Sequence, residues 1–350
     1  MEDYDYIIVG AGSAGCVLAA RLTQDAACRV LLIEAGGPDR SFNIHMPAGI
    51  GALLSRPNPY NWFGWTEPQE ALGGRKMYWP TGRGWGGTSS INGMAYIRGH
   101  RNDYDGWAAL GLTDWSYDRV LPYFCRAENN GRGESPFHGA SGPLRVSDTP
   151  TWMPLSQTFL NAGSAAGFAL TNDFNGAQQE GFGKLQMTVH RGRRWSTATG
   201  YLRPVLRRPN LTVCNHALVT RLLIRGDQIN GVQWLHRGTL QSARTTGEVV
   251  LCAGVTRTPQ ILMLSGIGDA SALAALGIGV IADRPEVGRN LQDHVSLTLK
   301  WQCREPVTLY SQTRMMNAAR TGLQYLLFRK GLARRKRRKR FAKASGLSGA

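Results

Sequence analysis

A glycine-rich turn between an apolar segment and a helical segment constrains the fold of this chain more than any other feature. Residues 4–9 predict a buried strand, residues 10–15 read G-x-G-x-x-G, and residues 16–23 predict a helix. A second apolar strand, residues 29–33, ends on Glu34. In this strand–helix–strand context, the pattern predicts a parallel α/β unit that binds a dinucleotide. The pattern alone does not choose between NAD and FAD.

Each small residue of the turn has a physical role. Gly10 permits the tight turn, Gly12 lets the backbone approach a pyrophosphate, and Gly15 lets the helix pack closely against the strand. The helix N-terminus presents free N–H groups and a positive dipole end to the phosphates. The carboxylate of Glu34 can accept hydrogen bonds from a ribose. A glycine-rich turn in an unrelated α/β domain is the alternative.

The length and composition are those of a folded protein. A chain of 350 residues with 42% hydrophobic residues can bury a large core and form one or two domains. The N-terminus predicts no secretory signal, and no apolar run approaches the roughly 18 residues of a membrane span. The six cysteines form no C-x-x-C pair. We therefore expect reduced thiols in a cytoplasmic protein, with no metal site and no disulfide framework; peripheral association with the inner membrane is left open.

The net charge of +17 arises largely from one end of the chain. Residues 331–350 contain 8 of the 41 basic residues and no acidic residue, so the other 330 residues have a net charge of +9. We favour a reading-frame shift or a truncated gene as the origin of this tail. A basic arm for nucleic acid or an anionic membrane, and a solvated charge run without a partner, are the alternatives. Because the tail has a single aromatic residue, Phe341, and no regular interleaving of aromatic with basic residues, we expect no specific nucleic-acid recognition.

The apolar pattern along the chain predicts an α/β fold. Residues 35–78 carry prolines and aromatic residues and predict a folded excursion over a cofactor rather than a linker. A strand at 248–252 leads into a helix at 258–265, with Thr258 as N-cap and Pro259 in the first turn. The order favours a parallel nucleotide-binding sheet with antiparallel additions. The other expected elements are helices at 116–128 and 155–167 and strands at 211–214, 219–225 and 229–236, the last two as a hairpin.

A second glycine-rich segment, residues 80–94, has five glycines in 15 residues. Such a backbone can lie flat against a ligand, and the hydroxyl and N–H groups of residues 88–90 can bind phosphate or ribityl oxygens. A flexible loop is the alternative. Because a flexible loop would leave Trp85 and Met94 exposed to water at a cost, we favour a second contact with the cofactor.

Four stretches of the chain carry longer sequence signatures, at residues 82–96, 92–100, 254–268 and 286–294. In this order they resemble the signatures of the glucose–methanol–choline (GMC) family of flavin oxidoreductases. The third stretch departs from the family pattern at Val255, where relatives have alanine or another small residue. The resemblance runs from Tyr4 to about Gly331 and ends where the basic tail begins.

The resemblance implies FAD, not NAD, as the cofactor. It places the ADP half on the first glycine-rich turn and Glu34, the adenine at the backbone of Val219, and the flavin along Trp85 and residues 92–95. In some choline-oxidising relatives a histidine is bonded covalently to the flavin; Ile91 stands at that position here, so we expect non-covalent FAD. The implied FAD-binding residues are Gly10, Gly12, Ser13, Ala14, Gly15, Glu34, Ala35, Trp85, Gly87, Thr88, Asn92, Gly93, Met94, Ala95 and Val219.

The resemblance also implies a reaction. The family oxidises a primary alcohol to an aldehyde by hydride transfer to flavin N5, while a histidine takes the hydroxyl proton. In the family that histidine belongs to a C-terminal segment that matches positions beyond 350, so we expect a C-terminally truncated chain and assign it no catalytic residue. The histidines present, none of them at the family's position for the base, are His45, His100, His138, His190, His216, His236 and His294.

Short matches at residues 44–47, 61–62 and 304–306 favour one branch of the family. They are closest to bacterial alcohol dehydrogenases that pass electrons to a quinone-type acceptor and not to oxygen. Choline dehydrogenase is the near alternative. An inactive FAD-binding fragment and a nucleic-acid binder that acts through the basic tail are alternatives from other classes. The sequence does not predict the alcohol or the oligomeric state.

The resemblance also suggests the domain organisation. Residues 1–298 would form the FAD-binding domain, with an insert of the substrate domain at 155–205. Residues 299–330 would begin the remainder of the substrate domain. Residues 331–350 would form the basic tail, either out of frame or disordered.

Overall fold

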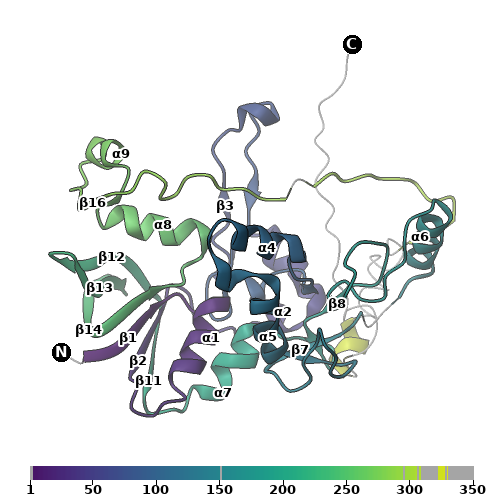
Figure 1. Cartoon of the computed structure of the whole chain (residues 1–350), viewed down its shortest axis with the longest axis horizontal. Helices are drawn as coiled ribbons and strands as arrows, with labels where there is room; N and C mark the ends of the chain where they lie inside the picture. Colours follow the sequence, from purple (N-terminus) through teal and green to yellow (C-terminus); the bar gives the residue numbers. More distant parts are fainter. Residues whose placement is uncertain are drawn as a thin grey trace.

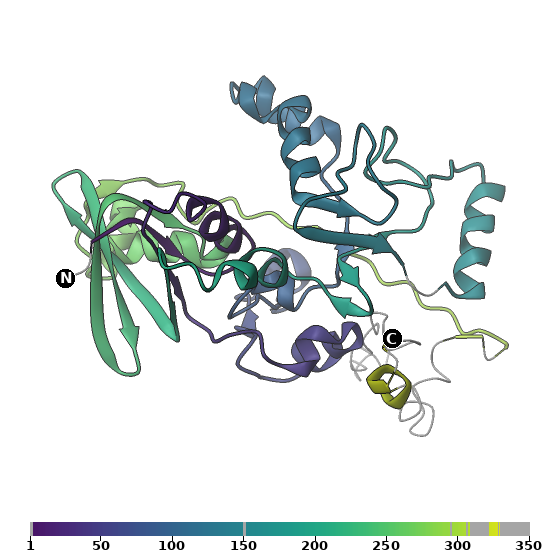
Figure 2. The same ribbon diagram turned by 90° about the horizontal axis from the view of Figure 1, so that it is seen from below.

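The structure, a computed structural model, consists of a six-stranded sheet with its helices and a smaller four-stranded part (Figure 1, Figure 2). It describes residues 3–149, 152–294, 296–305, 307–308, 322–327 and 329. The basic tail expected at 331–350 lies outside the described residues, as do parts of 299–330. The helices are α1 (Ser13–Leu22), α2 (Phe42–His45), α3 (Ile50–Ser55), α4 (Arg101–Ala109), α5 (Tyr117–Ala127), α6 (Pro154–Ala165), α7 (Arg203–Val205), α8 (Gly254–Leu264) and α9 (Ala270–Ala275).

The larger sheet has the strand order β11–β2–β1–β14–β13–β12. Its parallel half forms because the strands are apolar runs that helices cover on both faces; all five residues of β2 are buried. Among the described residues, β14 pairs with β13 only as far as Arg244 and beyond it pairs with β1 alone. The parallel strands are β11 (Leu211–Asn215), β2 (Val30–Glu34), β1 (Asp3–Val9) and β14 (Thr239–Leu251), and the antiparallel additions are β13 (Gln228–His236) and β12 (Ala217–Arg225).

Successive side chains of the central strands point to opposite faces of this sheet and so build two cores. On one face, Ile8 and Leu32 pack in a cluster with α1 and with the π-helix η5 (Ala198–Leu202). On the other face, Ile7 packs in a cluster with Ile261 of α8. The two helices α1 and α8 therefore lie against opposite faces of the same strands (Figure 1).

The smaller part is built on a sheet with the strand order β5–β8–β7–β6. Only β6 and β7 are parallel. Figure 2 shows this part and its helices standing to one side of the larger sheet. Its strands are β5 (Ala95–Tyr96), β8 (Gln186–Met187), β7 (Leu144–Asp148) and β6 (Glu128–Asn130), and the remaining short strands pair as β3 (Gly64–Trp65) with β4 (Tyr78–Trp79), β9 (Val189–His190) with β10 (Arg193–Arg194), and β15 (Ile267–Gly268) with β16 (Ala282–Asp283).

The fold confirms the predicted parallel sheet with antiparallel additions, but three elements begin earlier than expected. Helix α1, expected from residue 16, begins at Ser13, directly after the glycine N-cap Gly12. The strand expected at 248–252 is the end of β14, which begins at Thr239 and runs through a polar, exposed segment. The helix expected from Thr258 begins at Gly254, so Pro259 lies inside α8 and not in its first turn. The domain boundaries stay predictions, although η5 within the expected insert packs against α1 in the main core.

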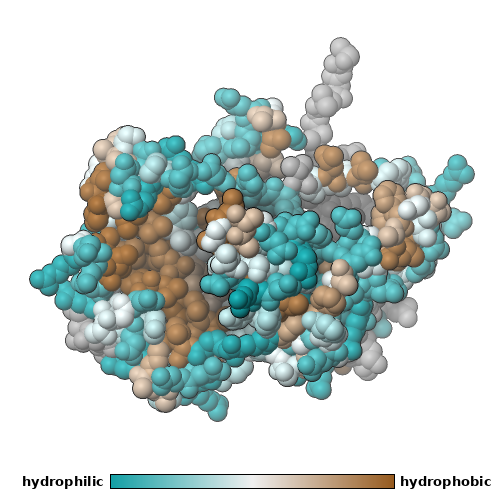
Figure 3. Space-filling view, viewed as in Figure 1, coloured by the Kyte–Doolittle hydropathy of each residue, from teal (hydrophilic) through white to brown (hydrophobic). Residues whose placement is uncertain are grey.

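The larger sheet also presents an apolar surface. Figure 3 shows a broad hydrophobic face over this sheet and α8. Exposed apolar side chains on these elements include Leu218, Leu235, Leu240, Val255 and Leu264. No helix within the described ranges combines the length and the hydropathy that crossing a bilayer requires. All six cysteines are free thiols, of which Cys16 is buried, and burial raises the pKa of Cys16 to about 12.

A buried polar network holds the smaller part together. Glu128, which is fully buried, accepts hydrogen bonds from Arg98 Nη2 at 2.8 Å and from Asn130 Nδ2 at 2.8 Å. His138 lies between two carboxylates, with Nδ1 2.9 Å from Glu128 Oε2 and Nε2 2.7 Å from Asp173 Oδ2. Because both ring nitrogens face carboxylate acceptors, this geometry favours the imidazolium form. The hydrogen bond to Glu128 accordingly raises the pKa of His138 above its ordinary value of 6.5.

The raised pKa of His138 predicts how stability depends on pH. A group whose pKa is higher in the folded state contributes stability that is fully present below its unfolded pKa of 6.5 and is lost as pH rises through the folded pKa. The substitution His138→Asn should therefore destabilise the protein most below pH 6.5, and the loss should shrink at alkaline pH. Thermal unfolding across pH measures this, with His236→Asn as the control outside the network. A His138→Asn loss that is independent of pH would contradict the charged assignment.

Candidate cofactor site

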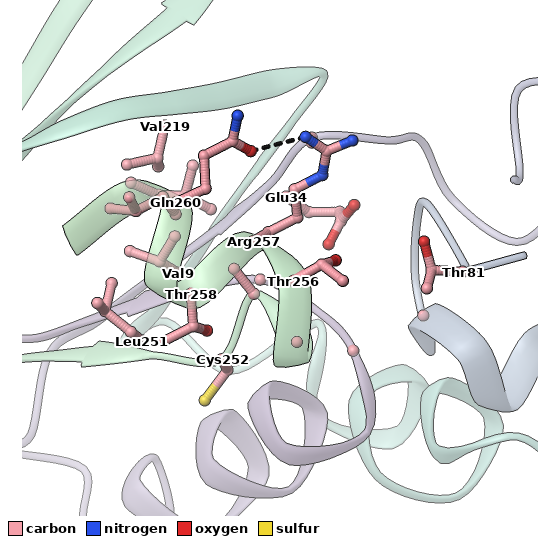
Figure 4. A pocket seen from close by; sticks show the side chains of 18 of the residues that line it. Val9, Glu34, Thr81, Val219, Leu251, Cys252, Thr256, Arg257, Thr258 and Gln260 are labelled. Atoms are coloured by element: carbon pink, nitrogen blue, oxygen red, sulfur yellow. Dashed lines mark hydrogen bonds between the residues drawn. The ribbon is translucent and has the colours of Figure 1, made fainter. Parts of the chain in front are cut away.

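A cavity of about 820 Å³ lies at the carboxyl ends of three parallel strands. Val9 ends β1, Glu34 ends β2 and Leu251 ends β14, and all three residues line the cavity (Figure 4). The carboxyl edge of a parallel sheet is the usual place for a ligand in α/β proteins. The volume lies within the range of about 300–1,000 Å³ that is typical of small-molecule and cofactor sites.

The carboxylate of Glu34 joins the two glycine-rich segments at the cavity wall. Its Oε2 accepts a hydrogen bond from the backbone N–H of Ala11 at 2.8 Å. Its Oε1 accepts from the N–H of Gly36 at 2.7 Å and from the N–H of Gly84 at 2.8 Å. The side chain is only 6% exposed. Since a carboxylate has about four acceptor positions, these three bonds leave one position, on Oε2, for a ligand.

The two glycine-rich segments also touch through their backbones. The N–H of Gly86 donates to the carbonyl of Ala11 at 2.7 Å. A Cβ atom placed on Gly87 would lie 2.8 Å from the Cα atom of Gly12, and Gly87 has a φ of +50°. At Gly15, an added Cβ would lie 1.9 Å from the carbonyl oxygen of Gly10. Residues without side chains are therefore required where the turn, helix α1 and the second segment meet.

Two helices begin at the cavity, and neither has a side-chain cap. The N-cap of α1 is Gly12 and the N-cap of α8 is Ala253, and neither accepts a backbone hydrogen bond through a side chain. The first-turn residues Ser13 and Gly254 line the cavity. Uncapped helix N-termini leave N–H groups unsatisfied and carry partial positive charge. The cavity is therefore suited to an anionic group such as a phosphate.

Trp62 and Arg257 line the cavity, and Arg83 contacts the same indole ring. The guanidinium carbons of Arg83 and Arg257 lie 4.7 Å and 4.3 Å from the ring centroid of Trp62. Arg257, in the first turn of α8, also donates to Gln260 Oε1 at 2.7 Å (Figure 4). Cys252 lines the cavity as well, and burial raises the pKa of its thiol above the ordinary value of 9.0. At neutral pH this thiol is uncharged.

Nine of the fifteen residues implied by sequence line this cavity, and six do not. Gly15 lies behind the turn, where it lets α1 approach. Trp85, which is 9% exposed, donates from Nε1 to Asn215 Oδ1 at 2.5 Å. The other four, Asn92 to Ala95, lie further along the second glycine-rich segment. The nine lining residues are Gly10, Gly12, Ser13, Ala14, Glu34, Ala35, Gly87, Thr88 and Val219.

Sequence reasoning missed the start of α8 and the cluster of Trp62 with its two arginines. The missed signal for α8 was Gly254, three residues after the strand ends. Pro259 placed the predicted helix start too late, because proline is common in the first turn of a helix. The sequence places Trp62 in an aromatic-rich excursion and in a short family match at residues 61–62. Its contact with Arg257 joins residues that are far apart in the chain, so no local pattern indicates it.

The fold and the cavity define a dinucleotide-binding α/β protein, and comparison with known proteins identifies the family. The chain belongs to the GMC oxidoreductase family, whose model matches residues 4–296. It is 48% identical over 332 residues to the mitochondrial choline dehydrogenase of Homo sapiens, covering 93% of this chain and 56% of that protein. It is 46% identical over 331 residues to an oxygen-dependent choline dehydrogenase of Paraburkholderia phytofirmans, covering 93% and 59%.

Solved structures agree with this assignment. Pyridoxine 4-oxidase from Mesorbium loti superposes with a TM-score of 0.78 at 36% identity, covering 81% of this chain and 56% of that one. An FAD-dependent oxidoreductase from Chaetomium thermophilum superposes with a TM-score of 0.85 at 32% identity, covering 95% and 60%. The chain thus spans about 56–60% of the length of these relatives. The predicted membership of the GMC family is confirmed.

The contact between Gly87 and Gly12 predicts the effect of a single methyl group. Gly87→Ala should destabilise the protein, because it combines a left-handed backbone, which costs about 1–2 kcal/mol, with the backbone contact at 2.8 Å. Gly74→Ala is the matched control, since Gly74 has a φ of +72° and nothing within 4 Å of an added Cβ. Urea unfolding should show the larger loss for Gly87→Ala. Equal losses of unfolding free energy in the two variants would show that the two glycine-rich segments can move apart at no cost in stability.

Proposed function

We propose that this chain holds FAD non-covalently and serves the oxidation of an alcohol. The observation that carries the proposal is the single cavity in which two uncapped helix N-termini, the first glycine-rich turn and Glu34 meet. Polar groups of this kind suit a pyrophosphate and a ribose. The close approach of backbone at Gly12 and Gly87 holds the two glycine-rich segments side by side at this cavity.

Different residues of this chain would bind the ADP half and the flavin half of the cofactor. The turn at residues 10–14 would bind the pyrophosphate through N–H groups, and the open acceptor position of Glu34 would bind a ribose hydroxyl. The backbone at Val219, which lines the same cavity, would contact the adenine. Beyond Gly87 and Thr88, which line the cavity, the second glycine-rich segment continues to residues 92–95, which would face the flavin.

FAD, when bound, would accept a hydride from the carbinol carbon of the alcohol. The described residues would bind and orient the cofactor. No histidine is among the residues that line the cavity. We therefore assign no proton acceptor to this chain, and an inactive FAD-binding fragment is the competing proposal. Turnover of any alcohol by the 350-residue chain would reject that competitor.

The substrate and electron acceptor are proposals that the relatives inform. The relatives at 48% and 46% identity are named choline dehydrogenases, which favours the near alternative, choline, over other primary alcohols. One of these names specifies oxygen dependence and the other does not, so a quinone-type acceptor and oxygen are both to be tested. Peripheral membrane association would accompany a quinone-type acceptor.

Absorption spectroscopy of the purified chain tests cofactor binding. After incubation with FAD and removal of unbound ligand, the protein should show the visible absorption bands of a flavin. Acid precipitation should then release the yellow colour into the supernatant, because Ile91 offers no group for a covalent bond. Colour retained in the pellet would overturn the non-covalent assignment, and the absence of flavin bands would overturn the site itself.

A further inference from the structure

Arg194 is a buried cation at the second glycine-rich segment. The residue ends β10 and is 1% exposed. Its Nε donates to the carbonyl of Ile44 in α2 at 2.9 Å. Its Nη1 donates to the carbonyl of Ser89 at 3.1 Å and to Oδ1 of Asn92 at 2.9 Å. Two of its three acceptors therefore belong to the segment that leads from the cavity towards residues 92–95.

The charge of Arg194 is not balanced within the described part of the chain. None of its acceptors is a carboxylate, and no ion pair to Arg194 occurs among the described residues. Its buried Nη2 has no hydrogen-bond partner among the residues that the structure describes. Burial lowers the pKa of the guanidinium to about 10, which still leaves it charged at neutral pH. Buried charges are normally paired, so an unpaired one marks a site at which a negative charge is expected.

The side-chain oxygen of Asn92 links Arg194 to the backbone. Its Oδ1 accepts from Arg194 Nη1 and also from the N–H of Met94 at 3.0 Å. Met94 is fully buried and has a φ of +60°, a left-handed conformation that is strained for a residue with a side chain. The carbonyl of Met94 accepts from the N–H of Thr188 at 2.9 Å. Strain of this kind persists only where the surroundings enforce it, and here Arg194 fixes the amide that shapes the turn.

We propose that Arg194 is the positioning residue of the flavin-facing segment, and that its unbalanced charge favours the reduced cofactor. The proposal rests on the proposed function, which places the flavin along residues 92–95. The two-electron reduced isoalloxazine ring carries a negative charge once its N1 proton is lost, whereas the oxidised ring is neutral. A fixed positive charge beside Asn92 therefore stabilises the reduced form more than the oxidised form and raises the midpoint potential.

Three variants separate the position of Arg194 from its charge. Arg194→Met removes both, and Arg194→Lys keeps the charge but cannot repeat the three contacts of the guanidinium. Arg193→Met is the matched control, because Arg193 is the half-buried neighbour in the same strand. The measurements are amide hydrogen exchange of residues 89–94 in the FAD-free protein, the dissociation constant for FAD, and the midpoint potential of the bound flavin.

Both substitutions of Arg194 should speed exchange at residues 89–94 and weaken FAD binding at least tenfold. Arg194→Met should also lower the midpoint potential, by about 30 mV for each tenfold shift in a two-electron equilibrium, while Arg194→Lys stays near the wild-type value. Arg193→Met should match the wild type in all three measurements. If Arg194→Met does not fold, Arg194→Lys tests both roles. Faster exchange in Arg194→Lys supports the positioning role, and an unchanged midpoint potential supports the electrostatic role.

The outcomes distinguish this inference from the proposed function. Wild-type protein that binds no FAD overturns the proposed function, and exchange at residues 89–94 in the FAD-free variants then decides the positioning role alone. Wild-type exchange rates in both Arg194 variants overturn the positioning role. An unchanged midpoint potential in Arg194→Met, with FAD bound, overturns the electrostatic role.

Discussion

The rest of the site depends on one buried carboxylate. Glu34 binds the backbone N–H groups of Ala11, Gly36 and Gly84, which belong to three separate loops. Hydrogen bonds to a charged group contribute roughly 1.5–3 kcal/mol each, so this one side chain holds the two glycine-rich segments together. Without it, three buried N–H groups would lack an acceptor, and the hydrogen bond from Gly86 N–H to the Ala11 carbonyl would be left to hold the two segments together.

The cavity next to Glu34 combines groups of opposite electrostatic character. Two helix N-termini present N–H groups to an anion, while the carboxylate accepts hydrogen bonds from hydroxyl groups. A dinucleotide carries both kinds of group, phosphates and ribose hydroxyls, a few ångströms apart. Arg194 extends this arrangement along the second glycine-rich segment, where its unpaired charge lies beside Asn92. In the proposed function, the phosphates would lie at the cavity end of this arrangement and the flavin at the Arg194 end.

The parts of the fold that sequence predicts are those that local patterns determine. The first strand–helix–strand unit and the two glycine-rich segments follow from apolar runs and from glycines at positions that tolerate no side chain. The first half of β14 was missed because its residues are polar and exposed. The start of α8 was misplaced because Pro259 usually marks a first turn. The contacts of Trp62 and Arg194 join distant segments, so only the three-dimensional structure shows them.

The central claim is that Glu34 unites the two glycine-rich segments into one FAD site. Titration of the FAD-free protein with FAD tests it most directly, with Glu34→Gln compared with the wild type and with the exposed control Glu70→Gln. Glutamine replaces one carboxylate oxygen with an NH₂ group, which cannot accept the hydrogen bonds that backbone N–H groups donate to Glu34. Glu34→Gln should therefore raise the dissociation constant for FAD at least tenfold. Glu70→Gln should bind as the wild type does. Equal affinity of Glu34→Gln and the wild type would contradict the account.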